Sequence, residues 1–121
     1  MLQGAMTIER IQPGPLMSAA VVHGSTVYLA GLIAADLNAN TKGQTEQILA
    51  KVDELLAAAG TDKSRVLKAN IWLTDISEWS QMNEAWTAWV LPDATPARAT
   101  VEARLAAPKA SVEIMIEAAR D

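Results

Sequence analysis

Two stretches near the C-terminus alternate strictly between side chains of different character, and they constrain the fold more than any other feature. Within residues 97–103, an arginine, a threonine and a glutamate fall on one face, and alanine or valine falls on the other. Within residues 112–118, valine, isoleucine and alanine share a face that glutamate and methionine oppose. A period of two residues is that of a β-strand. Because Ala107-Pro108-Lys109 interrupts the pattern as a turn would, the chain is predicted to end in two β-strands.

Each of these two strands carries a charged residue near its start, Arg98 in the first and Glu113 in the second. An arginine held on a strand beside small alanines is suited to binding a planar anion such as a carboxylate, because its guanidinium is always charged and presents a rigid fork of donors. The alternative is a solvated strand face on which the two residues form an ordinary salt bridge. The alternation alone leaves both interpretations open.

The rest of the chain supplies three strands, a long helix, a buried strand and a second helix. Gly24 separates two β-branched, alanine-rich runs and indicates a hairpin. Thr41 and Gln44 fit a capping box, apolar residues then recur at helical spacing, and Gly60 supplies a helix stop. The resulting order, β-β-β-α-β-α-β-β, is typical of an α+β domain with two helices on one face of a mixed sheet. The predicted strands outside the C-terminal pair cover residues 7–11, 18–22, 26–30 and 66–74, and the helices begin near residues 41 and 75.

The second helix carries an aromatic stripe. Trp79, Met82, Asn83, Trp86 and Trp89 recur at i, i+3, i+4, i+7 and i+10 and therefore share one face. Such a stripe is expected to be core packing and not a ligand cage. Asn83 is its one polar member and must find hydrogen-bond partners if it is buried.

Composition narrows the classes of function. The 121 residues predict one domain over residues 1–121, in which residues 1–5 look like an expression remnant or alternative start. The net charge is −4 and the ten Lys and Arg residues are scattered, which argues against a nucleic-acid partner. No apolar run reaches membrane-spanning length and no signal-peptide pattern opens the chain, so a cytoplasmic protein that does not contact a membrane is expected.

The inventory of reactive side chains is small. With no cysteine, the chain has no disulfide, thiolate nucleophile or cysteine metal site. His23 is the single histidine, so a histidine-built metal centre or a Ser-His-Asp triad is not expected. Its place in the predicted hairpin turn favours a solvated residue over a catalytic base.

Several short motifs, in this order along the chain, resemble the RidA (YjgF) family of reactive-intermediate (imine) deaminases. The resemblance spans roughly residues 7–119 and is specific because the motifs occur together and not because of any one of them. The motifs are Gly14-Pro15, Leu29-Ala30-Gly31, the helix–Gly60–strand segment, Met82-Asn83-Glu84-Ala85-Trp86, Pro96-Ala97-Arg98 and Val112-Glu113-Ile114.

The resemblance implies a chorismate-mutase-like fold that assembles as a homotrimer, with three sites in the clefts between subunits. It implies that Arg98 holds the carboxylate of a 2-imino acid and that Glu113 orients the attacking water. Backbone groups around Gly31 and Thr100 complete the contacts, and Asn83 lies nearby. The implied substrates are 2-aminoacrylate and 2-aminocrotonate, as imine tautomers released by pyridoxal-phosphate dehydratases. The products are a 2-oxo acid and ammonia, and neither cofactor nor metal is required. Such chemistry suits a chain without an obvious nucleophile, because an imine is already electrophilic and positioning of water and anion can suffice.

Three positions depart from the family pattern. Met17 stands where many active members have a substrate-contacting tyrosine, Thr100 replaces a common cysteine, and Leu32 follows Gly31 where glutamine is frequent. Thr100 can still donate and accept a hydrogen bond, whereas Met17 and Leu32 cannot replace the polar groups. These differences indicate a divergent branch.

Two other functions compete with deamination. Met17 and Leu32 favour a non-catalytic trimer that binds small carboxylates or acts as a chaperone, whereas Arg98 and Glu113 favour the enzyme. Ribonuclease activity has been attached to some relatives, but the acidic balance, the scattered basic residues and a histidine in a turn weigh against it.

Overall fold

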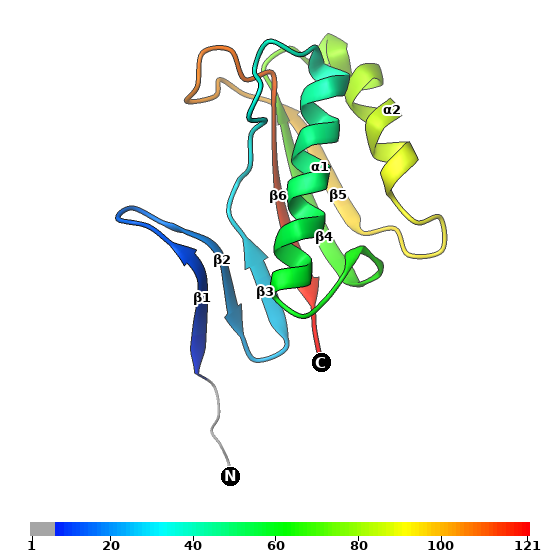
Figure 1. Cartoon of the computed structure of the whole chain (residues 1–121). Helices are drawn as coiled ribbons and strands as arrows, with labels where there is room; N and C mark the ends of the chain where they lie inside the picture. The colour runs from blue at the N-terminus through cyan, green and yellow to red at the C-terminus, as the bar shows by residue number, and fades with distance from the viewer. Residues whose placement is uncertain (1–6) are drawn as a thin grey trace.

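The computed structural model describes residues 7–121, which form a six-stranded sheet with two helices on one of its faces (Figure 1). The order of elements is the predicted β-β-β-α-β-α-β-β, and the prediction for residues 1–5 lies outside the described residues. Short 3-10 turns at Lys63–Arg65 and Ile76–Glu78 precede β4 and α2. The elements are β1 (Ile8–Pro13), β2 (Ser18–His23), β3 (Thr26–Leu29), α1 (Thr41–Ala58), β4 (Val66–Leu73), α2 (Trp79–Trp89), β5 (Ala97–Glu102) and β6 (Val112–Ala119).

The strands lie in the order β1-β2-β3-β6-β4-β5, so β5 forms one edge of the sheet. Neighbouring strands are antiparallel except for β4 and β5, which are parallel and joined through α2. A parallel pair requires a crossover connection of this kind, because a tight turn can only reverse the chain. The α+β class and the mixed sheet with both helices on one face are thus confirmed.

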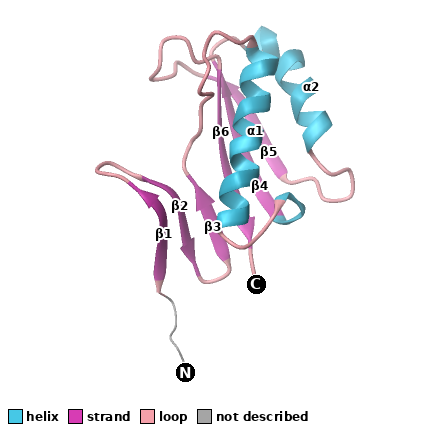
Figure 2. Cartoon of the chain, in the orientation of Figure 1, coloured by secondary structure: helices cyan, strands magenta, loops and turns pink. Residues whose placement is uncertain are grey.

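The two faces of the sheet differ sharply, as Figure 2 shows for the arrangement of helices and strands. The face under α1 and α2 is a continuous apolar core that includes Val27, Ile71, Ile114 and Ile116, each at most 1% exposed. The opposite face has no helix over it among residues 7–121. Its side chains include Tyr28, Val101 and Met115, which are 42%, 49% and 38% exposed.

Helix α1 begins differently from the prediction. Asn40 is the N-cap, and its side-chain oxygen accepts a hydrogen bond from the amide of Gly43 at 2.8 Å. Thr41 is the first helical residue, and its hydroxyl contacts Glu78 and, at 2.8 Å, the hydroxyl of Ser111. The predicted capping box is therefore wrong, because both of its side chains serve long-range contacts. The C-terminal stop is confirmed, since Gly60 has φ of +82°, a conformation that favours glycine.

Gln44 is the second half of the predicted box and is buried instead. Its amide nitrogen donates to the carbonyls of Leu37, Ala39 and Lys109 at 3.2, 3.0 and 3.3 Å. Its oxygen accepts from the amide of Ser111 at 3.0 Å. One side chain thus ties α1 to the segment that precedes it and to the loop that leads into β6.

Neither α1 nor α2, the two α-helices within the described part of the chain, is both long and apolar enough to cross a membrane.

Candidate functional site

Arg98 lies on edge strand β5, on the face of the sheet that α2 covers. Its Nη1 donates to Oδ1 of Asn83 at 2.8 Å. Its guanidinium carbon lies 5.3 Å from the ring centroid of Trp86 and 5.9 Å from that of Trp79. These three α2 residues follow one another at i, i+4 and i+7, so one face of the helix surrounds the arginine. Asn83 was expected to need a hydrogen-bond partner, and Arg98 provides it.

The charge of Arg98 has no acidic partner among residues 7–121, where every ion pair involves other cations. Arg98 is half-buried, and burial lowers the pKa of its guanidinium. The group remains protonated at neutral pH all the same. A half-buried cation that is held only by neutral groups is a ready site for an external anion.

Thr100 lies on the same face of β5, two residues beyond Arg98. Its Oγ1 is buried and has no hydrogen-bond partner within the described residues. Buried hydroxyls are normally paired, and an unpaired one costs free energy. The unpaired hydroxyl and the uncompensated cation are neighbours, and both would gain from an anion with hydrogen-bond acceptors.

Replacement of Thr100 by valine tests whether the hydroxyl serves the fold. We expect the free energy of unfolding to stay the same or rise by up to about 1 kcal/mol, because an unpaired polar group is removed without loss of volume. Thr45→Val is the matched control, since Thr45 is fully buried and its hydroxyl donates to the carbonyl of Thr41 at 2.7 Å. That variant should lose about 1 kcal/mol. Denaturant unfolding measures both, and an equal loss in the two variants would contradict the assignment.

Glu113 lies on β6 beside Gly31. The amide of Leu32 donates to the carbonyl of Ile114 at 2.8 Å and the reverse bond measures 3.0 Å, so the segment after β3 is pinned to β6. A Cβ atom at Gly31 would overlap Oε2 of Glu113 and lie 3.2 Å from its Cδ. The carboxylate of Glu113 occupies the space that a side chain at position 31 would fill. Glycine is therefore required at this position because of that contact and not because of its backbone conformation.

A double-mutant cycle tests this contact. Gly31→Ala should lower the free energy of unfolding by about 1–3 kcal/mol, because the new methyl group must displace the carboxylate. In a Glu113→Ala background the same change should cost little, because the displaced group is absent. Thermal or denaturant unfolding of the four proteins gives the coupling. An unchanged cost of Gly31→Ala in the Glu113→Ala background would mean that another neighbour resists the methyl group.

The pairing registers place Arg98 and Glu113 on opposite faces of the sheet. Arg98 is aligned with Ala69 of β4, whose side chain is buried under the helices. Glu113 is aligned with Trp72, three residues further along β4 and therefore on the other face. Arg98 and Glu113 are also separated within the sheet, by roughly 10 Å along the strand direction. They lie two strands apart, since β4 runs between β5 and β6. The interpretation of Arg98 and Glu113 as a surface salt bridge is therefore wrong, and a single chain does not bring them together.

The structure thus gathers the candidate residues into two groups on opposite faces of the sheet, here called half-sites. Arg98, Asn83 and Thr100 lie together at β5 and α2, and Glu113 and Gly31 lie together on the helix-free face. Within residues 7–121, no group of three His, Cys, Asp or Glu side chains could hold a metal ion.

Comparisons with known proteins show the family and the fold. The Endoribonuclease L-PSP family model matches residues 7–120. The chain belongs to this family, the YjgF/RidA family. The RutC family protein YoaB of Escherichia coli K12 is 42% identical over 114 residues, which cover 94% of this chain and 99% of YoaB. The crystal structure of a YjgF family member from Neisseria meningitidis matches with a TM-score of 0.93 and 40% identity, and covers 96% of this chain and 97% of that one.

A more distant relative has a name that states an activity. Reactive Intermediate Deaminase A, chloroplastic, from Arabidopsis thaliana is 30% identical over 103 residues, which cover 80% of this chain and 54% of that protein. The family resemblance inferred from the motifs is confirmed.

Of the three positions that depart from the family pattern, Thr100 lies beside Arg98 on β5, whereas Met17 and Leu32 lie away from it. Met17 is in the turn between β1 and β2, is 66% exposed, and stands next to Leu16, which is 93% exposed. Because three strands (β3, β6 and β4) lie between β2 and β5 in the sheet, Met17 does not reach Arg98 within one chain. Leu32 uses its backbone to hold Gly31 beside Glu113. His23 is exposed at the β2–β3 hairpin, where Gly24 has φ of 62°, and it belongs to neither half-site.

The sequence did not predict the part that Trp79 and Trp86 take around Arg98. Trp86 is 6% exposed and belongs to the core, as predicted for the aromatic stripe. Trp79 is 42% exposed and does not, which corrects that prediction for one residue. The spacing of both tryptophans around Asn83 was the available signal, but only the pairing of β5 with β4 brings Arg98 beneath α2.

Proposed function

We propose that this protein hydrolyses 2-imino acids, the tautomers of 2-enamines released by pyridoxal-phosphate dehydratases, to 2-oxo acids and ammonia. The observation that carries the proposal is the half-buried guanidinium of Arg98, which lacks an acidic partner among residues 7–121 and lies beside the unpaired hydroxyl of Thr100. Membership of the YjgF/RidA family and the name of the Arabidopsis relative support the reaction class.

Arg98 binds the substrate carboxylate in this proposal. One Nη1 bond is directed to Asn83, which orients the guanidinium and leaves its other donors available. A planar carboxylate can accept two parallel bonds from such a fork. The hydroxyl of Thr100 can donate a hydrogen bond to the same carboxylate, which would give the unpaired hydroxyl a partner.

Glu113 must come from a second copy of the chain, since one chain holds Arg98 and Glu113 on opposite faces of its sheet. We therefore propose a homotrimer with a shared site at each of its three interfaces. The half-exposed apolar side chains Tyr28, Val101 and Met115 on the helix-free face are suited to burial against a neighbour. The turn with Leu16 and Met17 protrudes from the same sheet and is available to approach the neighbour's bound substrate.

The chemistry balances without a cofactor or metal. The carboxylate of Glu113 accepts a proton from water as the water oxygen bonds to C2 of the protonated imine, which gives a tetrahedral carbinolamine. Protonated Glu113 returns this proton to the amino nitrogen, and the C–N bond breaks. The carbinolamine hydroxyl gives its proton to the Glu113 carboxylate as it becomes the C2 carbonyl, and that proton leaves with ammonia as ammonium, which restores the carboxylate. The electrophile is already activated, so the protein has to supply orientation and charge stabilisation.

A coupled assay tests the activity. A threonine dehydratase supplies 2-aminocrotonate, and the appearance of 2-oxobutanoate is timed with and without the protein. Arg98→Ala should lower catalytic efficiency about thirtyfold or more, because loss of one partner of a buried charge pair costs about 2–5 kcal/mol. Arg98→Lys should recover little, since an ammonium lacks the planar fork.

Glu113→Gln should retain 2-oxobutanoate binding and slow hydrolysis, because its role is toward water. Glu117→Gln is the matched control, since Glu117 lies on the same strand and the same face. An Arg98→Ala variant that turns over and binds like the parent would exclude this site.

Complementation tests the shared site. Arg98→Ala and Glu113→Gln chains are each strongly impaired by the proposal, but when they are unfolded together and refolded, about one quarter of the sites combine an intact Arg98 with an intact Glu113. Activity should return to about one quarter of that of the parent, while each variant refolded alone keeps its low residual rate. Light scattering should give three chains per particle. A stable monomer, or mixed chains without recovered activity, would refute the shared site.

The runner-up is a trimer that binds small carboxylates without turnover, which the apolar Met17 and Leu32 favour. In that case Arg98→Ala would weaken 2-oxobutanoate binding, and neither the parent nor any variant would accelerate 2-oxobutanoate formation in the coupled assay. Ribonuclease activity is named in the family model's description. The net charge of −4 and the half-burial of Arg98 weigh against it.

A further inference from the structure

The guanidinium of Arg98 is held by groups that do not neutralise it. The guanidinium carbon lies 5.3 Å from the ring centroid of Trp86 and 5.9 Å from that of Trp79, and Nη1 lies 2.8 Å from the amide oxygen of Asn83. An aromatic face attracts a cation through its quadrupole and carries no net charge. A carboxylate in the same place would compete directly with a substrate carboxylate.

We infer that Trp79 is a positioning residue for Arg98, and that its indole face holds the guanidinium in the orientation that binds the substrate carboxylate. This inference rests on the proposed function for the identity of the anion. It assigns to Trp79 an effect on substrate affinity, exerted through Arg98, and no direct part in the reaction.

Trp79 and Trp86 differ in what else they do. Trp86 is 6% exposed and part of the hydrophobic core, so its indole is needed for folding as well. Trp79 is 42% exposed at the first turn of α2, where it and Asn83 also line a shallow surface hollow of about 500 Å³. Its contact with Arg98 is therefore separable from core packing, and a smaller side chain there leaves no closed cavity.

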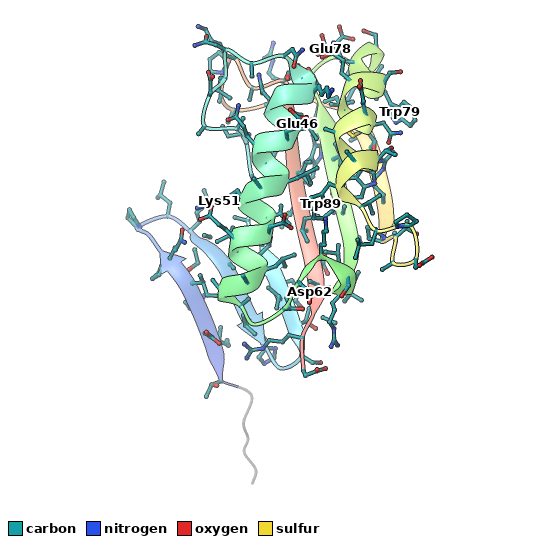
Figure 3. All side chains as sticks on the ribbon, turned by 45° about the vertical axis from the view of Figure 1, so that its right-hand side comes forward. Glu46, Lys51, Asp62, Glu78, Trp79 and Trp89 are labelled. Atoms are coloured by element: carbon teal, nitrogen blue, oxygen red, sulfur yellow. The ribbon has the colours of Figure 1, made fainter. Side chains whose placement is uncertain are left out.

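The same helix provides a matched control. Trp89 ends α2, and Figure 3 labels Trp79 and Trp89 at its two ends. Trp89 also lies beside a cation, Lys63, whose Nζ is 5.5 Å from the ring centroid, and its Nε1 donates to Asp53 at 3.0 Å. The Trp89 ring packs against that of Trp86 at 5.3 Å, and the cation beside it is Lys63 and not Arg98. Loss of the Trp89 indole therefore removes a comparable aromatic–cation contact and disturbs the same helix, while the Trp79 face beside Arg98 stays in place.

The test compares Trp79→Leu, Trp79→Phe and Trp89→Leu in the full-length protein. Calorimetry measures the Kd for 2-oxobutanoate, and the coupled assay separates KM from kcat. We expect Trp79→Leu to raise Kd and KM about threefold to thirtyfold, the range of one partly desolvated cation–π contact, with kcat unchanged. Trp79→Phe should show a smaller increase because its ring retains a quadrupole. Trp89→Leu should leave Kd and KM as in the parent.

A second readout does not depend on substrate. In arginine-labelled protein, the ¹⁵Nε–¹Hε signal of Arg98, assigned by its absence in Arg98→Lys, should carry an upfield ring-current shift. Trp79→Leu should reduce that shift and Trp89→Leu should leave it unchanged. If the parent neither binds 2-oxobutanoate nor deaminates, the proposed function fails while this signal still decides the positioning role. The inference is overturned if Trp79→Leu leaves the Arg98 signal unchanged, if Kd is unaffected in a parent that binds, or if Phe and Leu cause equal losses.

Discussion

The two hydrogen-bond ladders of β4 determine on which face of the sheet Arg98, Thr100 and Glu113 lie. On one side β4 pairs in parallel with β5, and on the other it pairs antiparallel with β6. Each ladder fixes which side chains share a face, and a shift of one residue would exchange the faces. The apolar residues Ala69, Ile71 and Leu73 must face the helices, so Arg98 and Thr100 face them too. Glu113, aligned with Trp72, must then face away.

This constraint makes a shared site the simplest account of the family motifs. Arg98 and Glu113 carry the polar chemistry of the chain's most specific motifs, yet the sheet separates them. If both serve one substrate, the second copy is needed for chemistry and not only for stability. The two half-sites also have different physical demands. Arg98 requires uncharged neighbours, here Trp79, Asn83 and Trp86, so that its charge stays available to a ligand. Glu113 requires a neighbour without a side chain, and Gly31 is that neighbour.

The half-site at Arg98 carries energetic costs that the fold must offset. Partial burial of a cation and of an unpaired hydroxyl each disfavour the folded state. The extensive apolar contact between the helices and the sheet opposes these costs. Buried Gln44 adds a separate constraint, because two of its four hydrogen bonds hold the loop before β6 and the other two hold the segment before α1.

The sequence alone determined the order of the elements, the strand faces, the helix stop at Gly60 and the candidacy of Arg98 and Glu113. Those properties are encoded by residues a few positions apart, as alternation, helical spacing or a single glycine. Only the tertiary structure decided that Arg98 and Glu113 lie on opposite faces, that Gln44 is a buried tie and not a helix cap, and that Trp79 lies beside Arg98. The first and third depend on which distant strands pair and in which register, and the second depends on which distant loops pack against α1. A local pattern specifies the type of a side chain and its face, and it does not specify the distant residues that the side chain contacts.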